Sequence, residues 1–310
     1  MKRITRVVML AVILLLPVIL FGCHKEEETE VAAFTYRGIL FEGFNPEKHK
    51  PTPELARGVE MERVMITPAE MKALMGIVDM LEKKDLLYLM EIPVRFVLVS
   101  GPYSFADKPQ MTVYIDREKI KMDYSVADDW QYKLSKFTPG LDLSEERVYF
   151  QGLPKLPNLL RIIIQEVGHL VEYKVLGFSW QGQFIANNLN RDFVAISWDE
   201  ENNWRDREKI LLRLETIREY EELAEFLTWF AGNSSFFSVY SSTGMTEDFA
   251  ESFVFYYLKT HFDYALQFFY GGELRLADLT VPTRGREEKI GFIAGVMQDP
   301  GLIDLIKKGR

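Results

Sequence analysis

The pattern of apolar and polar positions predicts two helices and two short strands in the first part of the chain. Apolar residues recur at helical spacing over residues 71–81 and again over residues 159–175. Runs at residues 94–99 and 111–116 are rich in β-branched and aromatic residues, which is typical of strands. We expect these two strands to pair in a small sheet that precedes the second helix.

The ends of both helices carry local signals. Residues 67–70, Thr-Pro-Ala-Glu, place a Thr N-cap before a Pro at the first helical position and a Glu at the third. The second helix is expected to start near Leu156, where Pro157 suits a first turn. Gly177 is the expected stop of this helix, because a glycine often follows the last helical residue.

The rest of the pattern is mainly helical. We expect a long loop over residues 178–204, helices over 210–230 and 246–266, and one or two short helices over 286–308. No internal repeat and no low-complexity tract is visible. The predicted class is α+β, with a small N-terminal sheet followed by a helical half.

The first residues predict an export signal. Lys2, Arg3 and Arg6 form a basic start, and residues 7–21 are an uncharged apolar run. This run is shorter than the about 20 residues of a membrane-spanning helix. A basic start, an apolar run and a small residue before the cleavage point are typical of a secretory signal peptide, here residues 1–22.

Cys23 is the only cysteine of the chain, so no disulfide can form within it. Its place directly after Leu-Phe-Gly resembles the lipobox of bacterial lipoproteins, in which the thiol is diacylated and becomes the mature N-terminus. This resemblance implies an exported chain that is anchored in a lipid bilayer of the bacterial cell envelope, in the outer membrane or at the cell surface. An ordinary signal peptide or an uncleaved anchor is the alternative.

Charge and composition narrow the partners. Removing residues 1–22 takes away three positive charges and moves the formal net charge from −9 to −12. Such a balance argues against nucleic acid, which is bound through clustered Lys and Arg. Residues 24–30 are mostly charged, and three prolines stand among residues 45–53. We therefore expect a tether over residues 23–53 and one folded domain over residues 54–310.

The strongest chemical signal lies in the helix of residues 156–177. Residues 165–169 read Gln-Glu-Val-Gly-His, which resembles the zinc-metallopeptidase motif His-Glu-x-x-His with glutamine in place of its first histidine. Gln165 and His169 project from one helix face, where they would bind the metal. Glu166 is one residue further round and would act as the general base on a metal-held water.

A second cluster of acids follows about eighty residues later. Residues 246–251 read Thr-Glu-Asp-Phe-Ala-Glu and predict a helix start that Thr246 caps. Glu247 and Glu251 are four residues apart and share one face. One of them would bind the metal, and the other would orient a neighbouring ligand from the second shell.

The stretch of residues 240–253 resembles the catalytic domain of anthrax lethal factor and its bacterial relatives, which are zincins. In that family a Tyr stands seven residues before a Glu, which is followed by an aromatic-Ala-Glu turn. The match covers residues 156–253. It implies a zincin-like metallopeptidase fold, in which the edge strand of the sheet binds extended substrate.

The same resemblance assigns roles to individual residues. Glu247 becomes the third zinc ligand, His169 a zinc ligand and Glu166 the general base. Tyr240 becomes the donor that stabilises the oxyanion of the tetrahedral intermediate. Gln165 occupies the place of the missing histidine.

The glutamine leaves the activity open. Zinc favours imidazole and thiolate over an amide oxygen, and the loss of one imidazole costs at least ~1.4–2.8 kcal/mol of the ~10–16 kcal/mol with which good sites hold zinc. One interpretation is a degenerate metallopeptidase that binds peptide or protein in its cleft with weak zinc or none. The other is an active zinc endopeptidase with a Gln-His-Glu site. A metal that prefers oxygen ligands, and a glycosidase-like carboxylate pair, are further alternatives.

Overall fold

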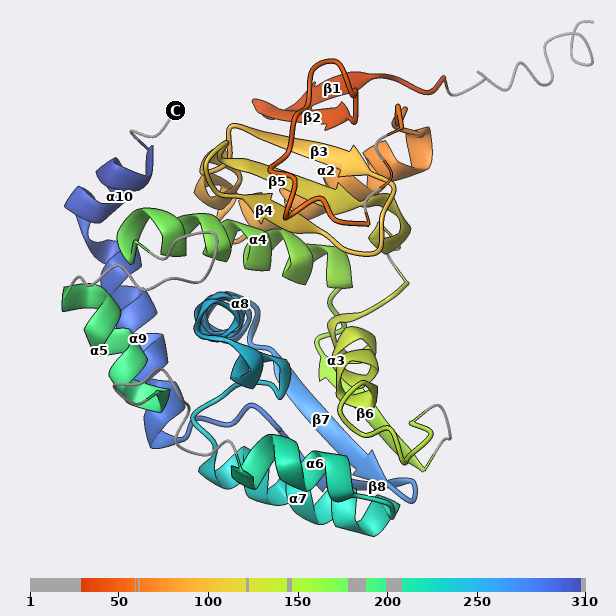
Figure 1. Ribbon diagram of the computed structural model, residues 1–310, viewed down its shortest axis with the longest axis vertical. Coiled ribbons are helices and arrows are strands. Elements are labelled where there is room, and N and C mark those ends of the chain that lie inside the picture. Colours follow the sequence, from red (N-terminus) through yellow and green to blue (C-terminus); the bar gives the residue numbers. More distant parts are fainter. Residues whose placement is uncertain are drawn as a thin grey trace, which may run out of the picture.

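The α+β class predicted from the sequence is confirmed. The structure is a computed structural model that describes residues 29–58, 60, 62–120, 123–143, 147–177, 188–198 and 208–307. In Figure 1 one sheet forms the upper part of the molecule, and helix α4 (Asn158–Val175) runs beneath it. A second, smaller sheet lies in the lower part, with helices around it.

The larger sheet has five strands in the order β1-β2-β3-β5-β4. Its strands are β1 (Ala33–Tyr36), β2 (Ile39–Gly43), β3 (Arg95–Val99), β4 (Phe105–Asp107) and β5 (Thr112–Asp116). The three central strands run parallel, and both edge strands run antiparallel to their neighbours. The two strands predicted from the sequence are β3 and β5, and they pair as expected. Strand β4 forms the edge next to α4.

The expected tether over residues 23–53 is wrong for the part that the structure describes. Strands β1 and β2 lie within that range, and β2 pairs with β3. Phe41 and Phe44 are fully buried. The folded domain therefore begins before residue 54. The prolines of residues 45–53 lie in a loop after β2, and that loop is fixed to the sheet because the Thr52 N–H donates to Asp107 Oδ2 at 2.8 Å.

Helix α2 (Pro68–Glu82) starts with the predicted capping box. The Glu70 N–H donates to Thr67 Oγ1 at 3.2 Å, and the Thr67 N–H donates to Glu70 Oε2 at 2.8 Å. The helix lies behind the large sheet in Figure 1. The hydroxyl of Tyr36 on β1 donates to Asp79 at 2.9 Å and ties the helix to the sheet.

Helix α4 ends as predicted before Gly177, whose φ of +67° favours glycine. It packs along α8 (Met245–Phe262). A Cβ at Gly168 would stand 3.1 Å from the ring of Phe253, which is fully buried. The glycine therefore allows the two helices to approach closely, and the start of α8 comes to lie beside the middle of α4.

The second sheet was not predicted. It is antiparallel, with the order β6 (Val148–Leu153), β7 (Ala265–Tyr270) and β8 (Glu273–Leu276). The helix expected over residues 246–266 ends at Phe262, where Asp263 adopts a left-handed conformation with φ +51°. The chain then turns into β7.

The remaining helices surround these sheets. They are η1 (Leu87–Glu91), η2 (Arg117–Lys119), α3 (Val126–Ser135), α5 (Asn188–Ser197), the π-helix η3 (Glu208–Leu212), α6 (Arg213–Thr216), α7 (Tyr220–Asn233), η4 (Tyr240–Thr243), α9 (Arg284–Gln298) and α10 (Pro300–Lys307). The helical tail is confirmed. Residues 210–230 are helical with a break after Thr216, and the loop expected over 178–204 contains α5.

The predicted signal peptide and Cys23 lie outside the described residues. Across the ranges that the structure covers, no helix combines the length and the apolar character needed to cross a bilayer.

Candidate functional site

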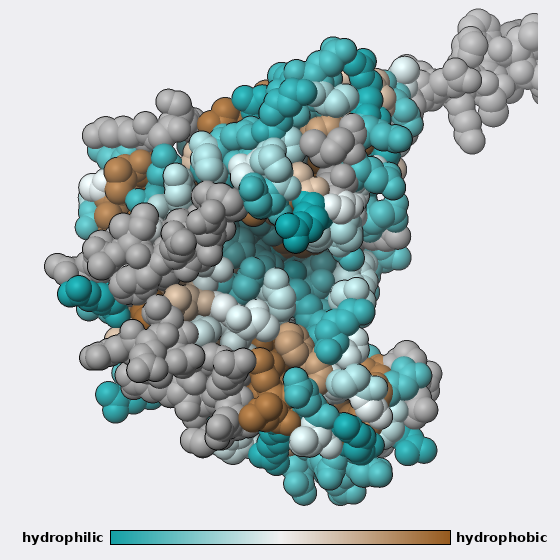
Figure 2. Space-filling model, in the orientation of Figure 1, coloured by the Kyte–Doolittle hydropathy of each residue, from teal (hydrophilic) through white to brown (hydrophobic). Residues whose placement is uncertain are grey.

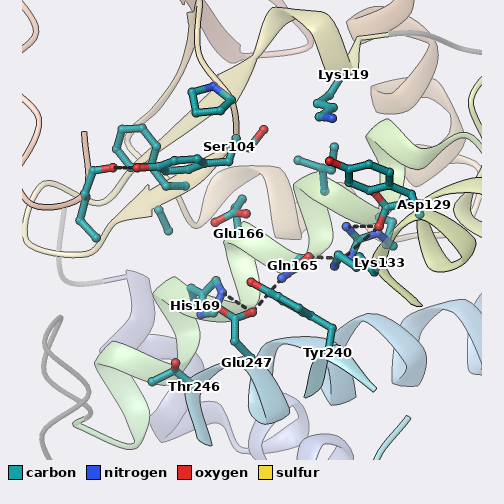
Figure 3. A pocket seen from close by; sticks show the side chains of 18 of the residues that line it. Ser104, Lys119, Asp129, Lys133, Gln165, Glu166, His169, Tyr240, Thr246 and Glu247 are labelled. Atoms are coloured by element: carbon teal, nitrogen blue, oxygen red, sulfur yellow. Dashed lines mark hydrogen bonds and ion pairs between the residues drawn. The ribbon is translucent and has the colours of Figure 1, made fainter. Parts of the chain in front are cut away.

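A cavity of about 460 Å³ opens between α4, the edge strand β4, α3, η4 and the start of α8. Figure 2 shows a hollow between the upper and lower parts of the molecule, and its visible lining is mostly hydrophilic. Figure 3 shows the side chains around the cavity. The polar groups therefore converge at the junction of the sheet and the helical half.

The structure brings the predicted site residues to this one cavity. Gln165, Glu166 and His169 reach it from α4, Glu247 from α8 and Tyr240 from η4. Nε2 of His169 lies 3.7 Å from Glu247 Oε2. The spacing of the two sequence motifs thus corresponds to two neighbouring helices. The predicted cap of α8 is wrong, since its N-cap is Gly244 and not Thr246.

Gln165 bridges two charged groups. Its Oε1 accepts a hydrogen bond from Arg161 Nη1 at 2.6 Å, and its Nε2 donates to Glu247 Oε2 at 3.2 Å. The reversed amide would turn its NH₂ toward the guanidinium and its oxygen toward the carboxylate, so the two charges determine the orientation. An amide binds a metal through its oxygen. Because Arg161 holds that oxygen, the contacts of Gln165 do not fit a zinc ligand.

His169 lies between two carboxylates. Its Nδ1 is 3.2 Å from Glu172 Oε2, and its Nε2 faces Glu247. Burial lowers the pKa of His169, but Glu247 and Glu172 outweigh burial and raise the pKa above its usual value. This environment favours the imidazolium. A protonated ring has no lone pair for a metal, so protonation and metal binding compete at His169.

Glu166 has a carboxyl group with few stabilising contacts in the described part of the cleft. It is 7% exposed and lines the cavity. Within the described part of the chain, no hydrogen bond or ion pair reaches its carboxyl group. Burial raises the pKa of Glu166 to about 6, and Glu247 adds to the effect while His169 opposes it. The group therefore presents a free carboxyl to whatever enters the cavity.

Glu251 is held inside the protein beside the cavity. Its Oε1 accepts from Arg161 Nη1 at 2.8 Å and lies 3.1 Å from Lys133 Nζ, and Ser238 donates to Oε2 at 3.0 Å. Burial raises the pKa of this carboxyl group, but Lys133 and Arg161 outweigh burial and lower it. Arg161 donates to both Glu251 and Gln165, so Glu251 positions Gln165 indirectly.

The network around Arg161 was not predicted from the sequence. Its Nη2 lies 2.9 Å from Asp129 Oδ2 on α3, and its Nε donates to Asn158 Oδ1 at 2.9 Å. Arg161 stands four residues before Gln165, so helical spacing could have placed it on the same face. Asp129 and Lys133 lie on a separate helix, and no spacing signal connects them to the motif.

Tyr240 forms the wall of the cavity opposite α4. Burial raises the pKa of its hydroxyl far above the ordinary value, and Glu247 and Glu251 add to the effect. The phenol is therefore neutral at physiological pH and can donate a hydrogen bond. Lys133 Nζ lies 4.1 Å from the centroid of the ring, and this cation–π contact fixes the position of the ring.

Among the residues that the structure describes, no three His, Cys, Asp or Glu side chains form a group that could hold a metal ion. No protein-family model, curated protein or solved structure matches the chain. The chemistry of the cleft is therefore the basis for assigning a function.

Proposed function

We propose that the chain is a zincin-like domain, anchored to a bacterial membrane through an acylated Cys23, that binds a peptide or protein segment in its cleft with weak zinc or none. One observation carries the proposal. The amide of Gln165 joins Arg161 to Glu247, and the resemblance to zincins assigns zinc ligands to Gln165 and Glu247.

The energetics of this bridge oppose metal binding. Glu247 Oε2 accepts from Gln165 Nε2 and faces His169, so two neighbouring groups already stabilise its carboxylate. Zinc would have to break the bond between Gln165 and Arg161 and displace a proton from His169. Hydrogen bonds to charged groups contribute about 1.5–3 kcal/mol each. These losses add to the weaker affinity of zinc for an amide oxygen.

The surroundings of the cleft support an extended ligand. Strand β4 is an edge of the large sheet and lines the cavity with Phe105 and Ala106. An extended peptide binds such an edge through its backbone hydrogen bonds, while pockets select its side chains. The cavity volume of about 460 Å³ lies in the range of ligand sites, ~300–1,000 Å³.

The second candidate is an active zinc endopeptidase. Two observations favour it: the free carboxyl of Glu166 has the character of a general base, and Tyr240 is a neutral donor at the opposite wall. The two candidates differ first in whether the native protein binds zinc tightly.

Zinc binding separates the candidates. The purified protein is dialysed against zinc at a fixed free concentration, and retained zinc is measured together with the binding and cleavage of a peptide library. We expect the native protein to bind peptides without retaining zinc. Gln165→His should retain zinc, and Glu247→Ala in that background should lose it.

Gln267→His, on β7, is the matched control for adding a histidine elsewhere in the fold. It should behave like the native protein. Stoichiometric zinc in the native protein, lost in Glu247→Ala and accompanied by peptide cleavage, would establish the endopeptidase instead.

A further inference from the structure

The charges on the α3 side of the cleft pair with one another. Two cations, Arg161 and Lys133, face two carboxylates, Asp129 and Glu251. Arg161 lies within 2.9 Å of both acids, and Lys133 Nζ is 3.1 Å from Glu251 and 3.6 Å from Asp129. Opposite charges at these distances inside a protein largely cancel. This group therefore offers no net charge to a ligand.

The charges at the other end of α4 form a second paired group. Lys108 Nζ lies 3.4 Å from Glu172 Oε2, and His169 lies between Glu172 and Glu247. Both carboxylates of this group therefore already have a partner. Gln165 adds a hydrogen bond to Glu247. Neither carboxylate of this group is left free for a ligand.

Two charged side chains of the cavity lining remain outside these groups. Glu166 is 7% exposed, and within the described residues no hydrogen bond or ion pair reaches its carboxyl group. Lys119, at the end of η2, lines the same cavity, and its Nζ lies 5.6 Å from the centroid of the Tyr132 ring. In Figure 3 Glu166 lies at the centre of the cavity, and Lys119 extends from a different wall. Among the described residues of the lining, Glu166 thus carries the negative charge that no hydrogen bond or ion pair holds.

We propose that the cleft selects peptides that place a Lys or Arg side chain against Glu166. This inference rests on the proposed peptide-binding function and names its selectivity. A buried carboxylate without a partner is unfavourable, and an entering cation removes that cost while forming a charge-assisted hydrogen bond. Phe105, Ala106 and Ile162 line the same cavity and are almost fully buried. They provide an apolar surface for the aliphatic stem of such a side chain.

A metal ion suits this position less well. Divalent cations that prefer oxygen take six or more ligands, or keep several waters beside one or two carboxylates. Every other carboxylate of the lining, Asp129 and Glu247, already faces a cation or a hydrogen-bond donor. A guanidinium or ammonium needs only one free carboxylate and apolar contacts along its stem.

The test uses a positional-scanning library of N-acetylated, C-amidated decapeptides, with binding to the native protein measured by fluorescence anisotropy in the presence of a chelator. We expect enrichment of Lys and Arg at one position. For the best peptide, Glu166→Gln should weaken binding about thirty-fold or more. The analogue with Gln at the basic position should bind native protein and variant alike.

Lys119→Gln is the matched variant, because it removes one charge of opposite sign from the same cavity. It should strengthen binding of the basic peptide by a few-fold. If peptides bind with no preference for basic residues, or if Glu166→Gln binds the best peptide as tightly as the native protein, the inference is overturned while peptide binding stands. If no peptide of the library binds, both the selectivity and the proposed function fail.

Discussion

Replacing Glu166 by glutamine should stabilise the protein. The substitution keeps the shape of the side chain and removes a carboxylate that has no partner among the described residues. Burial raises the pKa of Glu166 from its ordinary value of 4.5 to about 6. At 1.36 kcal/mol per pKa unit, ionisation of this group costs the folded state about 2 kcal/mol relative to the unfolded chain.

The gain should depend on pH in a defined way. Below about pH 4.5 the carboxyl is protonated in both states, and Glu166→Gln should change the stability little. As the pH rises from 4.5 to about 6, the folded state holds its proton while the unfolded chain releases it, so native stability falls relative to the variant. Above about pH 6 the difference is complete and constant.

Urea unfolding followed by tryptophan fluorescence measures this difference. Native protein, Glu166→Gln and the control Glu225→Gln, which changes an exposed glutamate on α7, are compared in chelator from about pH 4 to about pH 7.5. The control should change the free energy of unfolding by less than about 0.5 kcal/mol. A Glu166→Gln variant that is less stable than the native protein near neutral pH would refute the view of Glu166 as an unpaired charge.

Four further results are expected. Arg161→Ala should lower the free energy of unfolding by about 3–5 kcal/mol, because it removes the guanidinium that pairs with both buried acids, Asp129 and Glu251; urea titration measures the loss. Lys289→Met should cost about as much, since Asp248 is fully buried and bound to Lys289 at 2.6 Å, whereas adding Asp248→Leu should recover part of the loss in the same assay. Native stability should fall as the pH drops below about 4, because the pKa values of Asp129 and Glu251 are lowered in the folded state and their contribution disappears once they are protonated; the urea midpoint against pH records this, and Arg161→Ala should show a shallower slope. Chelator should leave the thermal midpoint of the native protein unchanged, while Gln165→His with zinc should lose stability on chelation, as calorimetry would detect.

The sequence predicted those helix ends and strands that depend mainly on residues close to them along the chain. The capping box of Thr67 and Glu70 and the stop at Gly177 depend on neighbouring residues, and both are present in the structure. The two parallel strands β3 and β5 were found for the same reason. Strands β1 and β2 were missed because nearby prolines and charges suggested a loose segment. Their stability comes from pairing with β3, a distant partner that the local pattern does not reveal.

The same limit applies to the second sheet and to the site. Strand β7 continues an aromatic, apolar sequence that also suits a helix, and only its pairing with β6 distinguishes the two. Two sequence motifs predict that five residues share one site. They are Gln165, Glu166, His169, Tyr240 and Glu247. The partners Asp129 and Lys133 on α3 carry no such motif. Their role depends on how α3 packs against α4, which spacing along the chain does not encode.

The bridge from Arg161 through Gln165 to Glu247 has a consequence for how the protein matures. In many metalloproteins the binding free energy of the ion is part of the folding free energy, so the apoprotein stays unfolded until it binds metal. Here a neutral side chain of the chain itself, Gln165, joins α4 to α8 through Glu247. The cleft can therefore assemble from its own residues, and the yield of folded protein should be the same in metal-poor and metal-rich surroundings.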